Sequence, residues 1–180
     1  MKFLELFLNK NALLRLDYDF DITEYIDGDI FITFIVEEKI IFSHETQLSY
    51  CVNLLLNIFS LILQKDPRVI INEDDFEFQN NYIHYLNGAE SVYKNEEYTN
   101  IIDFQYRENN SFSAFIFWNH EQIVFEVLEI EVNINKNEDI TNDIDYKNSK
   151  IVFKESLTIK IVKEWIKTLE TLSDRIGSKL

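Results

Sequence analysis

Residues 72–98 hold the side chains best suited to binding a protein partner, because acidic and aromatic residues interleave there in a stretch that we expect to be irregular. Tyrosine provides a large contact area at a low cost in side-chain entropy, and carboxylates attract a basic partner. The candidate partner-binding residues are Glu73, Asp74, Asp75, Glu77, Tyr82, Tyr85, Glu90, Tyr93, Glu96 and Glu97. The alternative is a solvated loop whose aromatic side chains fold back onto the core.

A second acidic stretch, residues 135–149, is expected to form a polar loop. Its carboxylates are Glu138, Asp139, Asp143 and Asp145. This loop is a further candidate for contact with a basic partner.

The aspartates Asp17, Asp19 and Asp21 have the spacing that opens a calcium-binding loop of the EF-hand type. That loop needs glycine at its sixth position and a bidentate glutamate at its twelfth. Ile22 and Gly28 stand at these positions, so the pattern fails. Alternation along a strand explains the three aspartates better, because it places them together on one solvated face.

Neither the histidines nor the single cysteine follow a pattern typical of a metal site or a nucleophile. His44, His84 and His120 lie 40 and 36 residues apart, without the short spacing of paired ligands. Cys51 lies in an apolar stretch, whereas a catalytic thiol needs an electropositive and partly exposed setting. We therefore predict no metal ion and no cofactor, and a core position for Cys51.

Motifs of known catalytic sites are missing from the sequence. It contains no glycine-rich phosphate loop, no G-x-S-x-G nucleophile elbow and no H-E-x-x-H motif. Carboxylate pairs such as Glu126 with Glu129 occur, but 32 acidic residues supply such pairs by chance. Trp118 and Trp165 lie in apolar patterns typical of a core. We predict no catalytic residue and a protein that is not an enzyme.

The composition is that of an acidic globular protein. The 180 residues include 17 basic and 32 acidic side chains, which gives a formal net charge of -15. The hydrophobic content of 46% is too high for disorder, and the length favours a single domain over residues 1–180. A surface so negative argues against binding nucleic acid or an anionic membrane, since both require Lys and Arg.

No targeting or membrane-spanning segment is recognisable. The first apolar stretch is short and is interrupted by Glu5. Residues 46–64 carry no charge, but five polar side chains fall on one helical stripe, which a lipid-facing helix would not need. We expect a cytoplasmic protein.

The hydrophobic patterns predict an antiparallel α+β fold with one sheet of about six to eight strands. Strand patterns cover residues 3–8, 13–20, 29–36, 40–42, 100–107, 111–118, 122–134 and 150–154. Two helices are expected, at about 44–64 and 157–176, packed on one side of the sheet. Short connectors between the strands favour hairpins.

One short internal similarity links the two halves of the chain. Lys39-Ile40-Ile41-Phe42 precedes the first predicted helix, and Lys150-Ile151-Val152-Phe153 precedes the second. The chain can therefore be described as two rounds of antiparallel strands, each followed by a helix. Chance remains an equal explanation in a sequence so rich in Ile and Lys.

The second half of the chain resembles a known group of small acidic proteins. It runs through Ile101-Ile102-Asp103-Phe104, Phe115-Ile116-Phe117-Trp118 and a long strand from Val124 to Ile134, and ends in an amphipathic helix with Trp165. In size, acidity and this element order it resembles the immunity proteins of bacterial toxin systems, including contact-dependent inhibition. The resemblance implies a cytosolic, non-catalytic α+β protein that neutralises a toxin domain, commonly a basic nuclease.

Two other functions fit the same sequence. One is a different acidic binding protein, either a DNA mimic that inhibits a nucleic-acid enzyme or an adaptor subunit. A DNA mimic would present carboxylates in regular rows along an elongated face. The other is an enzyme with an unrecognised carboxylate site, which would require a concave pocket with converging polar groups and shifted pKa values.

Overall fold

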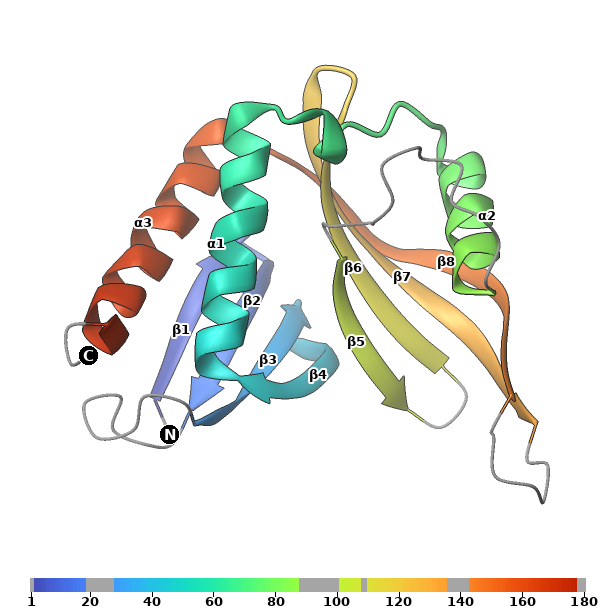
Figure 1. The fold of residues 1–180 in the computed structure, drawn as a ribbon, viewed down its shortest axis with the longest axis horizontal. Helices are drawn as coiled ribbons and strands as arrows, with labels where there is room; N and C mark the ends of the chain where they lie inside the picture. The colour runs from blue at the N-terminus through green and yellow to red at the C-terminus, as the bar shows by residue number, and fades with distance from the viewer. Residues whose placement is uncertain (1, 19–27, 88–100, 108–109, 136–142, 178–180) are drawn as a thin grey trace. The chain divides into compact units, whose positions relative to one another are not determined.

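The computed structural model describes residues 2–18, 28–87, 101–107, 110–135 and 143–177, and it has the predicted α+β fold with antiparallel strands. Figure 1 labels the strands and α-helices by their order in the chain and leaves the 3-10 helix η1 without a label. These elements are β1 (Lys2–Phe7), β2 (Ala12–Tyr18), β3 (Asp29–Val36), β4 (Lys39–Gln47), α1 (Leu48–Gln64), the 3-10 helix η1 (Pro67–Val69), α2 (Asp75–Leu86), β5 (Ile101–Arg107), β6 (Asn110–Asn119), β7 (Gln122–Asn135), β8 (Asp143–Leu157) and α3 (Ile159–Gly177).

The chain, expected from its length to form one domain, divides into two compact units. Unit 1 comprises Met1–Asp66 and Leu157–Leu180, and unit 2 comprises Pro67–Ser156. The prediction of one sheet is wrong, because the strands form sheet A in the order β1-β2-β3-β4 and sheet B in the order β5-β6-β7-β8. Alternating hydrophobicity identifies a strand, but it does not say which strands pair across an intervening helix.

Sheet A is an antiparallel meander with one buried face. The register pairs Leu6 with Leu14, Leu14 with Phe34, and Phe34 with Phe42, all four of them buried. The rings of Phe34 and Phe42 stack with centroids 5.5 Å apart. The alternation seen in the sequence therefore does place one side of these strands in a core, as expected for a half-buried antiparallel sheet.

Helices α1 and α3 pack against each other within unit 1 (Figure 1). Phe59 of α1 contacts Trp165 of α3 with ring centroids 5.1 Å apart, and Trp165 Nε1 donates a hydrogen bond of 2.9 Å to the carbonyl of Phe7. Helix α1 begins at Leu48, later than predicted, because β4 continues to Gln47 in register with Asp29. No helix in the described ranges has both the length and the apolar character needed to cross a membrane.

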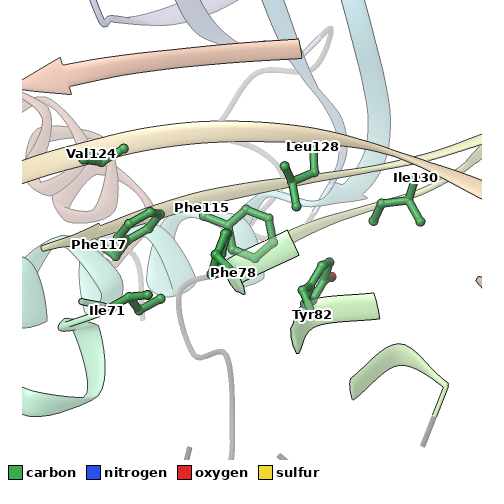
Figure 2. Close-up of a cluster of buried hydrophobic side chains, with 8 residues drawn as sticks. All are labelled: Ile71, Phe78, Tyr82, Phe115, Phe117, Val124, Leu128 and Ile130. Atoms are coloured by element: carbon green, nitrogen blue, oxygen red, sulfur yellow. The ribbon is translucent and has the colours of Figure 1, made fainter. Parts of the chain in front are cut away.

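Unit 2 consists of sheet B, η1 and α2. Strand β6 pairs antiparallel with β5 and β7. Side chains of β8 contact β7 in reverse order, from Ser156 with Gln122 to Asn148 with Glu131, so this pair is antiparallel as well. Figure 2 shows the buried cluster in which α2 meets the sheet. Its members are Ile71, Phe78, Tyr82, Phe115, Phe117, Val124, Leu128 and Ile130.

Helix α2 lies in the stretch that we expected to be irregular. Its local signal is a capping box, because Asp74 is followed three residues later by Glu77. Phe78 and Tyr82, four residues apart, then form the buried stripe of a helix. The mixture of acidic and aromatic residues conceals this short period, and the carboxylates that suggested a solvated loop instead begin the helix.

Strand β8 is also longer than predicted, since residues 143–149 of the expected polar loop belong to it. The repeated four-residue segments occupy the fourth strand of each sheet, with Lys39 at the start of β4 and Lys150 within β8. Each sheet thus has four strands in chain order, and a helix follows the fourth. The two units are nevertheless not repeats of each other, because α3, the helix that follows β8, belongs to unit 1 and not to the unit that contains sheet B.

The turn between β3 and β4 offers a first test of the fold. Glu37 and Glu38 form a two-residue hairpin loop with φ angles of 49° and 66°. These angles lie in the left-handed region, which is strained for a residue with a Cβ atom and unstrained for glycine. We expect Glu38→Gly to stabilise the protein by about 0.5–1 kcal/mol in urea unfolding. Glu45→Gly, within β4, is the control and should destabilise it. An unchanged or lower midpoint for Glu38→Gly would contradict the turn geometry.

Candidate functional site at the start of helix α2

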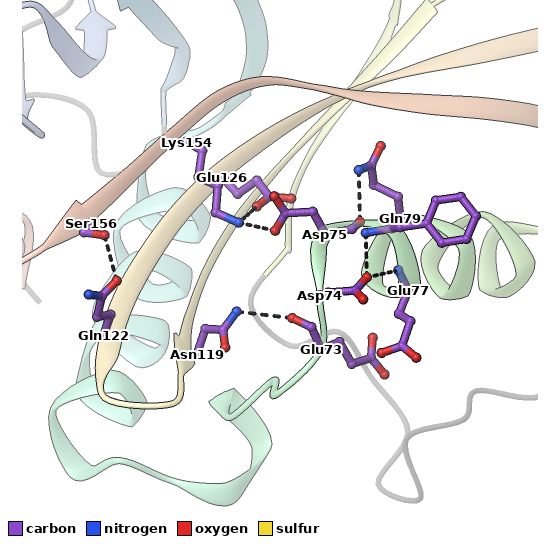
Figure 3. A network of polar contacts seen from close by, with 11 residues as sticks. Glu73, Asp74, Asp75, Glu77, Gln79, Asn119, Gln122, Glu126, Lys154 and Ser156 are labelled. Atoms are coloured by element: carbon purple, nitrogen blue, oxygen red, sulfur yellow. Dashed lines mark hydrogen bonds and ion pairs between the residues drawn. The ribbon is translucent and has the colours of Figure 1, made fainter.

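The first turn of α2 presents three neighbouring carboxylates to solvent. Asp74 is the N-cap, and its Oδ1 accepts hydrogen bonds from the backbone N–H of Phe76 at 3.0 Å and of Glu77 at 2.9 Å. Asp74, Asp75 and Glu77 are all exposed. Negative charge is favourable here because the unpaired N–H groups and the helix dipole both attract it. The acidic surface therefore coincides with a stable helix start (Figure 3).

Phe76 and Phe78 point in opposite directions from this turn. Phe76 is 74% exposed, the highest value among the large apolar side chains in the described ranges. Phe78 is buried, with its ring centroid 5.0 Å from that of Phe115 and 5.2 Å from that of Phe117. The buried ring holds the helix on the sheet while the exposed one remains available to a partner.

Tyr82 contributes a second anchor one turn further along α2. Its side chain is fully buried, its ring meets Phe115 edge to face, and its hydroxyl forms a 2.8 Å hydrogen bond with Ser113 Oγ. A buried hydroxyl needs such a partner. The assignment of Tyr82 to the partner surface is therefore wrong, because its apolar ring completes the α2 period. Tyr85 is half-buried and stacks on Tyr82.

Ion pairs of Lys154, one of them with a buried carboxylate, connect the acidic turn to the sheet. Lys154 of β8 lies between two carboxylates, with Nζ 3.1 Å from Oε2 of the buried Glu126 and in contact with Oδ1 of Asp75 (Figure 3). Only 1% of the Glu126 side chain is exposed, against 32% for Lys154. Lys154 therefore ties Asp75, at the start of α2, to both β7 and β8.

The pKa values of this pair follow from burial and charge. Burial raises the pKa of the Glu126 carboxyl, and the positive charge of Lys154 opposes that rise. Burial alone would lower the pKa of Lys154, but its contacts with Asp75 and Glu126 outweigh burial and raise it. The ammonium group of Lys154 is thus held in its charged form.

Polar contacts also hold the segment that leads into α2. Asn119 Nδ2 donates to the carbonyl of Glu73 at 3.2 Å, and the N–H of His120 donates to Asn72 Oδ1 at 3.1 Å. Asn81 Nδ2 donates to Glu73 Oε1 at 3.1 Å. An open groove of about 600 Å³ lies here; its lining residues are Asn72, Glu73, Asp74, Asp75, Phe76, Asn119 and His120. The β6–β7 hairpin thus fixes the approach to the acidic turn.

The structure brings together only part of the predicted partner surface. Asp74, Asp75 and Glu77 are exposed side by side, and Glu73 is half-buried beside them. The predicted residues Glu90, Tyr93, Glu96 and Glu97 lie outside the described residues, as do Glu138 and Asp139 of the second acidic stretch. Asp143 and Asp145 belong to β8.

Sequence reasoning missed three residues of this site. The exposed Phe76 could have been found from the capping box, because the second helical position lies away from the stripe formed by Phe78 and Tyr82. Glu126 and Lys154 carry no such signal, since they belong to different strands and meet only in the tertiary structure.

The structure bears on the sequence-based expectations for the cysteine and, in its described part only, for candidate metal ligands. Burial raises the pKa of Cys51 to about 12, so its thiol is protonated at neutral pH, as its apolar setting predicted. Within the described ranges, no three His, Cys, Asp or Glu side chains are grouped as metal ligands.

No family model matches this chain, and no curated protein or solved structure matches it. What the protein does must therefore be inferred from its own geometry and charge.

Proposed function

We propose that this protein is a non-catalytic immunity protein that binds and neutralises a basic toxin domain, with the first turn of α2 as its contact surface. The observation that carries the proposal is the exposed ring of Phe76 between the exposed carboxylates of Asp75 and Glu77. Aromatic side chains are enriched at the centre of protein interfaces, and charges complementary to the partner around them favour correct docking.

The charges and the aromatic ring have different roles in this proposal. The net charge of -15 attracts a basic domain from a distance and raises the association rate, most strongly at low ionic strength. Once the surfaces meet, burial of the Phe76 ring slows dissociation. The acidic surface would then occupy the place of the toxin's anionic substrate.

The contacts beneath the surface support a preorganised interface. Phe78 and Tyr82 fix α2 on sheet B, and the Asp74 cap fixes its first turn. A surface that is already ordered loses little conformational entropy on binding. Such rigidity suits an inhibitor that must act as soon as it meets its toxin.

The test is affinity purification of the tagged protein from its own bacterium, with neighbouring genes intact, using wild type and two variants. Phe76→Ser/Glu77→Lys alters the proposed surface, and Glu170→Lys on the exposed side of α3 makes the same change of charge elsewhere. We expect wild type and Glu170→Lys to capture a basic domain that arrests growth when expressed alone. Phe76→Ser/Glu77→Lys should bind it at least about tenfold more weakly, the loss of one hot-spot contact.

The captured domain also allows the electrostatic contribution to the association rate to be measured. Its association rate with the wild type should fall as salt rises from 50 to 500 mM, since screening shortens the reach of the charges. Capture of no such domain, or equal capture by all three proteins, would refute the proposed function. A salt-independent association rate would refute the electrostatic part alone.

A further inference from the structure

The face of sheet A opposite the buried one is unusually apolar for an exposed surface. The described residues include seven exposed large apolar side chains, and four of them lie on this face. Their exposed fractions are 58% for Phe3, 53% for Phe7, 45% for Phe31 and 56% for Ile40. Together they expose roughly 300–400 Å² of apolar surface, the size of the largest patch on a typical monomer and often a functional one.

The strand register makes these side chains one continuous patch. Phe3 and Phe31 flank Asp17 in one row across the sheet, and Phe7 shares another row with Ile40. The two rows are four residues apart along β1, about 13 Å, and the four strands span about 14 Å. The patch therefore covers a nearly square area that another protein can contact in one piece.

The centre of the patch is polar and internally paired. Arg15 Nε lies 2.9 Å from Asp17 Oδ1, and its guanidinium lies over the Phe3 ring, 6.0 Å from the centroid. Thr33 Oγ1 donates to Asp17 at 3.4 Å. The positive charge of Arg15 is thus neutralised within the patch, and Asp17 is buried beneath its neighbours.

The other charges of this face are all negative. Beyond the Arg15–Asp17 pair, its described residues include the carboxylates Glu5, Asp29 and Glu45, at its edges in the register. An apolar centre with acidic edges is complementary to apolar side chains flanked by Lys or Arg. A second copy of this chain would bring the same carboxylates and a further net charge of -15 against it.

We propose that this outer face of sheet A is a second protein-binding surface, which takes a basic segment with alternating apolar and cationic side chains. The proposal does not depend on the α2 surface, because the two belong to different units of the chain. It assigns to unit 1 a binding role that the sequence did not indicate.

The test uses the full chain, labelled with ¹⁵N, and a synthetic peptide of alternating leucine and lysine as the probe. We expect the peptide to shift amide resonances of β1 to β4, and Phe3→Ser/Phe31→Ser to weaken its binding at least fivefold. Phe7→Ser/Ile40→Ser, in the other row, should give the same loss and serves if the first variant does not fold. Ile159→Ser, at an exposed apolar side chain of α3, is the matched control, and it should leave the shifts in sheet A unchanged.

Three results would overturn the proposal. The first is unchanged peptide affinity in a folded sheet A variant. The second is equal binding of a serine–lysine peptide, which would mean that charge alone is recognised. The third is a dimer of the wild type in sedimentation equilibrium that the Phe3→Ser/Phe31→Ser change dissociates, which would make a second copy the occupant. Failure of toxin capture by the α2 surface would leave all of these measurements unaffected.

Discussion

Replacing Phe78 by alanine is expected to destabilise unit 2 by about 3–5 kcal/mol, the usual loss for a buried aromatic ring. Phe78 is 2% exposed, and its ring contacts those of Phe115 and Phe117. The substitution removes contacts between α2 and sheet B and leaves a cavity that the rigid strands cannot close. Urea unfolding followed by far-UV circular dichroism measures the loss.

The chain offers a matched control on the same helix turn. Phe76→Ala removes the same ring from a side chain that is 74% exposed, so it should change stability by less than about 0.5 kcal/mol. The two variants separate folding from binding, because Phe76→Ala should weaken partner capture without loosening α2. Similar unfolding midpoints for the two variants would mean that α2 does not pack on sheet B as described.

The second large effect is expected from Lys154→Met. This substitution leaves the buried Glu126 without its cation and also removes the contact of Lys154 with Asp75. Breaking a buried ion pair from one side costs about 3 kcal/mol when the retained charge has little access to water. The loss of stability should lie at the lower end of the usual range because the Lys154 side chain is 32% exposed.

The double variant Glu126→Leu/Lys154→Met tests the cause of this loss. It removes both charges and fills the site with apolar side chains, so it should recover most of the stability lost in Lys154→Met. If the double variant is as unstable as Lys154→Met, the loss comes from packing of the lysine side chain and not from an unpaired carboxylate.

The effect of Lys154→Met should depend on pH in a defined direction. The pKa of Glu126 is raised in the folded protein above its ordinary value of 4.5, so the folded state binds its proton more tightly than the unfolded state. The raised pKa contributes its full stabilisation of the folded state below pH 4.5, and this contribution is lost as the pH rises through the pKa of the folded state. Without Lys154 that pKa rises further, so the loss of stability should be small in acid and full near neutral pH.

The check is urea unfolding of wild type and Lys154→Met at a series of pH values. The difference between the two should grow as the pH rises from 4 to 8. Adding Glu126→Gln to both proteins should flatten the difference, since the titrating group is then absent. A difference that shrinks with rising pH would contradict the assignment to Glu126.

The parts of the fold that follow from local pattern agree with the sequence. Strand β3 covers the predicted residues 29–36, and α3 has its predicted stripe, with Val162, Trp165 and Leu169 buried. These elements could be predicted because the alternation of a strand and the 3.6-residue period of a helix are properties of neighbouring residues. Acidity, the core position of Cys51 and the failure of the calcium-loop pattern are likewise properties of the sequence.

The candidate site was only partly predictable, because it depends on tertiary packing and not on neighbouring residues alone. The carboxylates of Asp74, Asp75 and Glu77 could be proposed as a partner surface from composition. The capping pattern could even have placed them on a helix. Whether an aromatic residue of this stretch faces solvent or the core depends on how α2 lies on the sheet, which separates Phe76 from Tyr82.

The sequence determines the type of each element and the excess of negative charge, since both depend only on which residues occur and in what order. The tertiary structure decides which strands share a sheet, that α3 joins unit 1, and that Lys154 meets Glu126. These arrangements join residues far apart in the chain, and their free energy comes from burial and charge pairing that exist only after the chain has folded. The tertiary structure likewise decides that the rings of Phe3, Phe7 and Phe31 are exposed, because strand register and coverage, not residue type, leave them at the surface.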